Sequence, residues 1–102
     1  MAPGQRPYGQ VLAGFTSDGK GHDLFVQLEP GHCYTFVTVG APTIKEINTY
    51  LWEPNTNRRL ADNRSNTNLS HLTTCATMPG AYHYQAKSTG GYGEYRLGIY
   101  TQ

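Results

Sequence analysis

The stretch from Gly80 to Tyr100 alternates apolar and polar residues on both sides of a glycine-rich segment. Residues of one parity before and after that segment are apolar or aromatic: Tyr82, Tyr84 and Ala86, then Tyr95, Leu97 and Ile99. The glycines of Ser88–Gly93 can take the positive φ of a tight turn. This pattern predicts a β-hairpin with one apolar face. Because a lone hairpin is only marginally stable, that face must pack on a second β layer.

Six upstream segments also have the composition or the alternation of strands: Gln10–Phe15, His22–Leu28, His32–Val39, Glu46–Trp52, Arg58–Asp62 and Leu69–Ala76. Turn residues separate them at intervals of roughly eight to twelve residues, which is typical of an antiparallel sandwich. One of the turns, Ser17–Gly21, contains Asp-Gly, a strong hairpin signal. Asn63–Asn68 is predicted to be a polar loop. The sequence therefore predicts an all-β fold, a single antiparallel β-sandwich of seven to eight strands.

The length of 102 residues allows one domain. Residues 1–9 are rich in Pro and Gly and are predicted to be an arm or linker, and residues 10–102 the sandwich. A formal net charge of +1 argues against nucleic acid as a partner. No apolar run has the length of a membrane span. The first ten residues lack the apolar core of a signal peptide, so none is expected in this chain.

The two cysteines, Cys33 and Cys75, each lie inside a predicted strand. Neither belongs to a CxxC pair or has a histidine at zinc-site spacing. A disulfide between them would contribute about 4 kcal/mol on the chain-entropy estimate. Two buried free thiols are the alternative. A disulfide would place the chain in an oxidising compartment, secreted, extracellular or periplasmic.

Four segments in this order resemble bacterial pre-peptidase C-terminal (PPC) domains: EPGHCYTFVTVG, INTYLWEPNTNRRLAD, CATMPGAYHYQA and GEYRLGIY. The Cys33/Cys75 pair looks like a cysteine-containing branch of that family. The resemblance implies a jelly-roll-like sandwich appended to secreted proteases and other exported bacterial proteins, collagen-binding modules among them. Glu46 and Asn48 stand where the family pattern has aspartates, which weakens any calcium role that the pattern implies.

No catalytic motif is recognisable in the sequence. The four histidines fall in separate segments, namely His22, His32, His71 and His83, and no serine lies in a GxSxG elbow. We therefore expect no enzyme and no cofactor. Asp62 and Asn63 are weak calcium candidates, since both offer oxygen ligands; side-chain to backbone hydrogen bonding in an Asn-rich loop is the favoured alternative.

The most suggestive residues are Asn48, Tyr50 and Trp52. If Ile47 and its alternate neighbours face the core, these three form a stripe on the outer face and are predicted to bind a ligand. The alternative is that the N-terminal arm, with Tyr8, or a nearby loop covers Trp52.

The predicted function is a non-catalytic binding or accessory module of a secreted bacterial protein. It would recognise a matrix protein or a carbohydrate through the stripe. The alternative is a self-assembling structural subunit, bound to copies of itself through the arm and the strand edges.

Overall fold

The computed structural model describes residues 6–7, 12–16, 19–56, 58–64 and 66–101, and the regular structure in these ranges is entirely β. Its strands are β1 Arg6–Pro7, β2 Leu12–Thr16, β3 Gly21–Leu28, β4 Cys33–Gly40, β5 Ile44–Trp52, β6 Arg59–Arg64, β7 Leu69–Cys75, β8 Gly80–Gly91 and β9 Gly93–Thr101. No helix able to cross a membrane occurs in this part of the chain.

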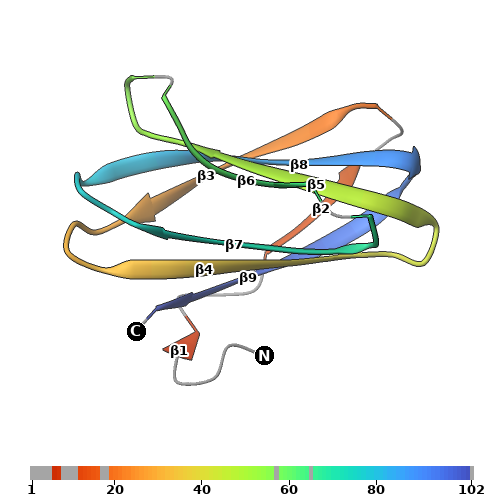
Figure 1. Ribbon diagram of the computed structural model, residues 1–102, viewed down its shortest axis with the longest axis horizontal. Helices are drawn as coiled ribbons and strands as arrows, with labels where there is room; N and C mark the ends of the chain where they lie inside the picture. Colours follow the sequence, from red (N-terminus) through yellow and green to blue (C-terminus); the bar gives the residue numbers. More distant parts are fainter. Residues whose placement is uncertain (1–5, 8–11, 17–18, 57, 65, 102) are drawn as a thin grey trace.

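The strands form two antiparallel sheets that lie face to face (Figure 1). Sheet A has the order β1-β9-β4-β7, with β2 also paired to β9, and sheet B has the order β3-β8-β5-β6. Eight main strands and the two-residue β1 make up this arrangement. The predicted antiparallel β-sandwich is therefore confirmed. The short strand β1 places Arg6 and Pro7 of the predicted arm beside Thr101 and Tyr100 of the same chain.

The predicted C-terminal hairpin is wrong. Strand β8 lies in sheet B between β3 and β5, whereas β9 lies in sheet A, so the two strands are not hydrogen-bonded to each other. The glycine-rich segment instead carries the chain from one sheet to the other. Gly91 has φ 143° in this crossing, and a Cβ there would collide with the carbonyl oxygen of Thr43. This close approach explains why the position requires glycine.

The Asp-Gly hairpin is wrong for the same reason, because β2 belongs to sheet A and β3 to sheet B. Among the described strands, only β5 and β6 are consecutive in sequence and paired. Their connection includes Asn55 at φ 62°. The predicted polar loop also starts later than expected, since β6 continues through Asn63 and Arg64.

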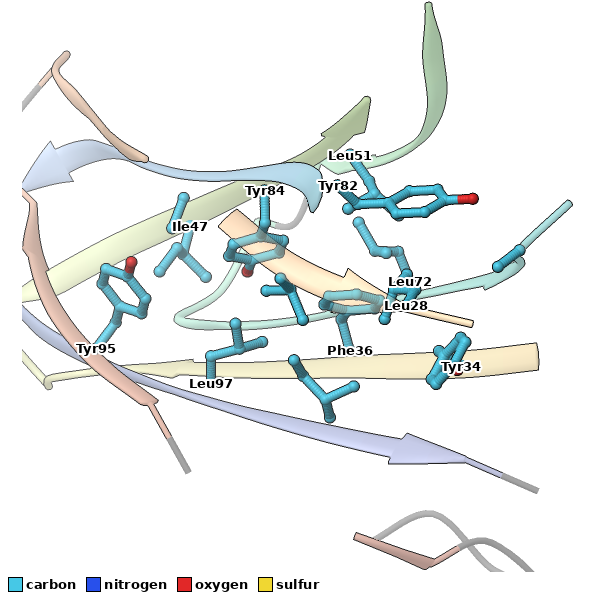
Figure 2. Close-up of a cluster of buried hydrophobic side chains, with 14 of the residues drawn as sticks. Leu28, Tyr34, Phe36, Ile47, Leu51, Leu72, Tyr82, Tyr84, Tyr95 and Leu97 are labelled. Carbon is cyan, nitrogen blue, oxygen red and sulfur yellow. The ribbon is translucent and has the colours of Figure 1, made fainter. Parts of the chain in front are cut away.

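Tyrosine side chains fill much of the space between the sheets (Figure 2). Four of them are at most 1% exposed. Each hydroxyl has a hydrogen-bond partner: for Tyr34 the Glu29 backbone, for Tyr82 the Met78 carbonyl, for Tyr84 the Thr38 hydroxyl and for Tyr95 the His22 imidazole. Burial raises the pKa of Tyr95 to about 12. The core therefore leaves none of these four hydroxyls unpaired, as buried polar groups require.

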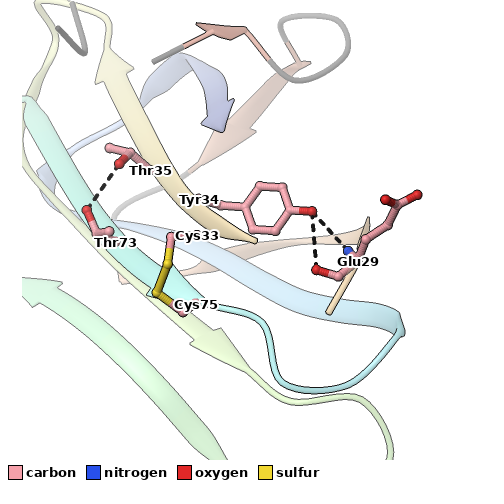
Figure 3. Close-up of a disulfide and its surroundings, with 6 residues drawn as sticks. All are labelled: Glu29, Cys33, Tyr34, Thr35, Thr73 and Cys75. Atoms are coloured by element: carbon pink, nitrogen blue, oxygen red, sulfur yellow. Dashed lines mark hydrogen bonds between the residues drawn. A yellow bond between two sulfur atoms is a disulfide. The ribbon is translucent and has the colours of Figure 1, made fainter. Parts of the chain in front are cut away.

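The disulfide joins Cys33 of β4 to Cys75 of β7, which are register partners in sheet A (Figure 3). Alternation along β4 places Cys33 on the outer face, because Tyr34 and Phe36 are buried. The hydroxyls of Thr35 and Thr73 are 3.2 Å apart on the same two strands. The predicted disulfide is confirmed.

Candidate functional site

The outer face of sheet B carries the most concentrated group of aromatic side chains on the described surface. The register places Phe25 of β3 opposite His83 of β8, and His83 opposite Trp52 of β5. On the other side, Trp52 pairs with Arg59 of β6. Residues from four strands thus meet in one row across the sheet, although they are far apart in the sequence.

These side chains stack on one another. Ring centroids are 5.0 Å apart for Phe25 and His83, 4.7 Å for His83 and Trp52, and 5.8 Å for Trp52 and Tyr50, with interplanar angles of 19°, 23° and 29°. The guanidinium carbon of Arg59 lies 5.7 Å from the Tyr50 centroid. Spacings of this kind are favourable for aromatic pairs and for cation–π contacts. We call these five residues the aromatic ladder.

A short polar network fixes the ring of His83 within the ladder. Its Nε2 lies 2.7 Å from Oδ1 of Asp23, and the same carboxylate oxygen accepts a hydrogen bond from Nε2 of Gln85 at 3.0 Å. The hydrogen bond from His83 is the main cause that lowers the pKa of Asp23. The Asp23 side chain remains half exposed, so this network lies at the surface.

A shallow hollow of about 210 Å³ lies beside the ladder. Its lining combines two rings, three cations and one amide: Tyr50, Trp52, Arg59, Arg64, Gln85 and Lys87. At the opposite end of the ladder, Phe25 is 69% exposed on the edge strand β3. The face thus offers an apolar end and a basic end.

The predicted stripe of Asn48, Tyr50 and Trp52 lies on this outer face. The residues that alternate with it are buried: Ile47, Thr49 and Leu51. Two of them, Tyr50 and Trp52, belong to the ladder. Asn48 donates from Nδ2 to Thr89 at 3.4 Å. Tyr8, predicted as a possible cover for Trp52, lies outside the described residues. The ligand-binding role of the stripe stays a prediction.

Four residues of this face were not predicted as site residues: Phe25, His83, Asp23 and Gln85. Phe25 and Asp23 lie on the face of β3 opposite the buried Val26 and Leu28. The missing information was that β3 and β5 flank β8, which brings these side chains to Trp52.

The weak calcium candidates do not converge. Asp62 and Asn63 are neighbours on β6 and therefore point to opposite faces. Asp62 lies 3.6 Å from Arg59 on the outer face, and Asn63 accepts a hydrogen bond from Ser70 at 2.7 Å. Within the described ranges no group of three His, Cys, Asp or Glu residues could hold a metal ion. Asp62 and Asn63 thus do not face a common site, and a calcium role for either stays a prediction.

Two of the four histidines are held by side-chain hydrogen bonds. Nδ1 of His22 lies 2.6 Å from the Tyr95 hydroxyl, and His83 is held by Asp23. His32 and His71 are exposed. Among the described hydrogen bonds, none joins a histidine to a serine, threonine or cysteine.

A second pair of exposed rings lies where the chain crosses from β8 to β9. Phe15 is 54% exposed and Tyr92 is 62% exposed, and their centroids are 6.4 Å apart. This pair is smaller than the ladder. Glu94 is the register partner of Phe15 and also lines a hollow of about 230 Å³.

No protein-family model matches the chain, and no curated protein does. A solved structure does match: the crystal structure of PliG from Aeromonas hydrophila, a periplasmic lysozyme inhibitor of g-type lysozyme. The TM-score is 0.71 at 14% sequence identity, over 100% of this chain and 91% of PliG. The chain shares the fold of PliG. At this identity the likeness shows the fold alone. The resemblance to PPC domains stays a prediction.

Proposed function

We propose that this chain is a non-catalytic protein-binding module that works in an oxidising compartment and contacts its partner through the aromatic ladder. The observation that carries the proposal is the ladder itself. It joins residues from all four strands of sheet B and leaves Phe25 largely exposed to solvent. Trp, Tyr and Arg are the residue types that contribute most to binding energy in protein interfaces.

The stacking favours a protein over a carbohydrate as the ligand. Sugars bind by lying on the open face of an aromatic ring. Here His83 stacks with both Phe25 and Trp52, and Trp52 stacks with both His83 and Tyr50. A ring face that a neighbouring ring occupies is not available to a sugar. A patch of packed rings with polar neighbours resembles a protein interface, with its apolar centre and polar rim.

The disulfide supports a location outside the cytosol. The reducing cytosol keeps cysteine thiols reduced, whereas exported proteins retain their disulfides. Charged residues make up only 15% of the chain and the surface has few lysines and glutamates. A periplasmic protein, PliG, has the same fold. These observations support a bacterial exported module, either free or attached to a larger protein.

The partner to test first is g-type lysozyme, because PliG inhibits that enzyme and has the same fold. The test is binding of purified g-type lysozyme by the wild-type protein, together with inhibition of lysis of a cell-wall suspension. Trp52→Ala removes the centre of the ladder. Val39→Ala is the matched control, since Val39 is 40% exposed on the outer face of sheet A.

We expect Trp52→Ala to weaken binding by at least about tenfold, as for a central interface residue, and Val39→Ala to leave it unchanged. Failure of the wild-type protein to bind would remove g-type lysozyme as the partner. Equal binding by Trp52→Ala and Val39→Ala proteins would refute the ladder as the binding surface. A partner captured from exported proteins by the wild-type chain should show the same dependence on Trp52.

A further inference from the structure

The hollow beside the ladder brings three cationic side chains to one place. Arg64 of β6 and Lys87 of β8 are both register partners of Asn48, so they flank it from opposite sides. Arg59 reaches the same hollow over the Tyr50 ring. These cations come from two strands that are separated by β5 in the sheet.

The positive charge at the hollow is only partly balanced. Arg59 is 3.6 Å from Asp62, and both side chains are more than two-fifths exposed. Among the described residues, no ion pair is found for Arg64 or Lys87. Two further carboxylates lie on this face. Asp23, on the strand next to β8, accepts hydrogen bonds from His83 and Gln85. Glu46 precedes Asn48 by two positions on β5 and is the register partner of Thr89, and no ion pair is found for it among the described residues. The hollow therefore has an excess of positive charge within a chain whose net charge is only +1.

We propose that the hollow receives an aspartate or glutamate side chain of the protein partner. Arginine guanidinium groups bind carboxylates in a bidentate fashion, and lysine adds a point charge. The rings of Tyr50 and Trp52 supply apolar surface for the methylene groups of such a side chain. This inference rests on the proposed function, and it states the chemistry that the partner must present beside the ladder.

A nucleic acid fits the hollow less well. Phosphate backbones are bound by extended fields of Lys and Arg, whereas these three cations surround one small hollow. A single acidic side chain is a more local anion, which suits so small a hollow. The experiment must therefore distinguish the binding of a carboxylate from the binding of phosphate.

The inference can be tested without the partner. The wild-type protein, labelled with ¹⁵N, is titrated with a capped hexaglutamate peptide, with capped hexalysine and inorganic phosphate as separate controls. The reporters are the Trp52 indole N–H and the Gln85 side-chain amide. Two double variants remove two positive charges each: Arg64→Gln/Lys87→Gln at the hollow and Arg96→Gln/Lys45→Gln elsewhere on the exposed surface.

We expect hexaglutamate to shift both reporters saturably. The dissociation constant should rise at least about tenfold in the hollow variant, as expected when charged hydrogen bonds are lost, and change less than twofold in the control variant. No saturable shift, equal weakening in the two variants, or equal binding of phosphate would each overturn the proposal.

The outcome is separable from that of the proposed function. Loss of partner binding in Trp52→Ala without any hexaglutamate binding would keep the ladder and overturn the carboxylate site. Hexaglutamate binding at the hollow with partner binding unaffected by Trp52→Ala would refute the ladder, and the acidic group would then bind the hollow alone.

Discussion

Removal of the Cys33–Cys75 disulfide is expected to cost a large part of the stability of the domain. The two residues are 42 positions apart, and a closed loop of that length lowers the entropy of the unfolded chain enough to contribute about 4 kcal/mol. Small domains have unfolding free energies of about 5–15 kcal/mol. The variant Cys33→Ala/Cys75→Ala should therefore remain folded, but with a much smaller free energy of unfolding.

The expected change in melting temperature follows from the same figure. A domain of this size loses roughly 4–8 °C per kcal/mol, so the double variant should melt roughly 15–30 °C lower. Two local factors keep the loss close to the entropic value. The cysteines lie on the outer face of sheet A, so their removal creates no core cavity. The backbone pairing of β4 with β7 continues as far as Val39 and Leu69, so the two strands stay paired without the disulfide.

The assay is guanidinium unfolding followed by Trp52 fluorescence and by circular dichroism. The wild-type protein treated with a reductant should match the double variant, because both lack the same cross-link. A loss below about 1 kcal/mol, or identical curves for oxidised and reduced wild-type protein, would show that the disulfide does not stabilise the fold in this way.

Three further predictions concern stability. Gly91→Ala should destabilise the protein by more than about 3 kcal/mol, because the new Cβ would collide with backbone. Gly19→Ala, at positive φ in open space, should cost only about 1 kcal/mol. Urea unfolding of the two variants measures the difference. Because its pKa is lowered in the folded state, Asp23 contributes stability above its unfolded pKa that is lost as the pH falls through the folded value. Asp23→Asn should therefore flatten the dependence of the urea midpoint on pH in the acid range, and an unchanged dependence would show that the bond to His83 contributes nothing. Tyr84→Phe should cost about 1–3 kcal/mol, because the buried hydroxyl of Thr38 loses its partner. Thermal unfolding at neutral pH measures this loss, and an unchanged melting temperature would contradict the prediction.

Alternation along the sequence predicted which side chains face the core, but not which strands pair. Tyr82 and Tyr95 both face inward, as predicted, yet they belong to different sheets. The reason is that alternation depends on the pleat of a single strand, whereas pairing depends on residues distant in the chain. A glycine-rich segment such as Ser88–Gly93 is compatible with a tight turn and with a crossing between sheets.

The candidate site was predicted in part for the same reason. The outward positions of Tyr50 and Trp52 followed from the alternation of β5 alone. Their stacking with His83 and Phe25 required the order β3-β8-β5, which no local pattern specifies. The cationic hollow likewise depends on β6 and β8 lying on opposite sides of β5.

Hydroxyl-radical footprinting shows whether a protein partner binds over the aromatic ladder. It compares the free protein with its complex, formed with g-type lysozyme or with a captured exported protein. Oxidation of Phe25 and Trp52 should fall in the complex, while oxidation of Phe15 and Tyr92 should stay the same. Protection of Phe15 and Tyr92, with Phe25 and Trp52 as reactive as in the free protein, would contradict this prediction.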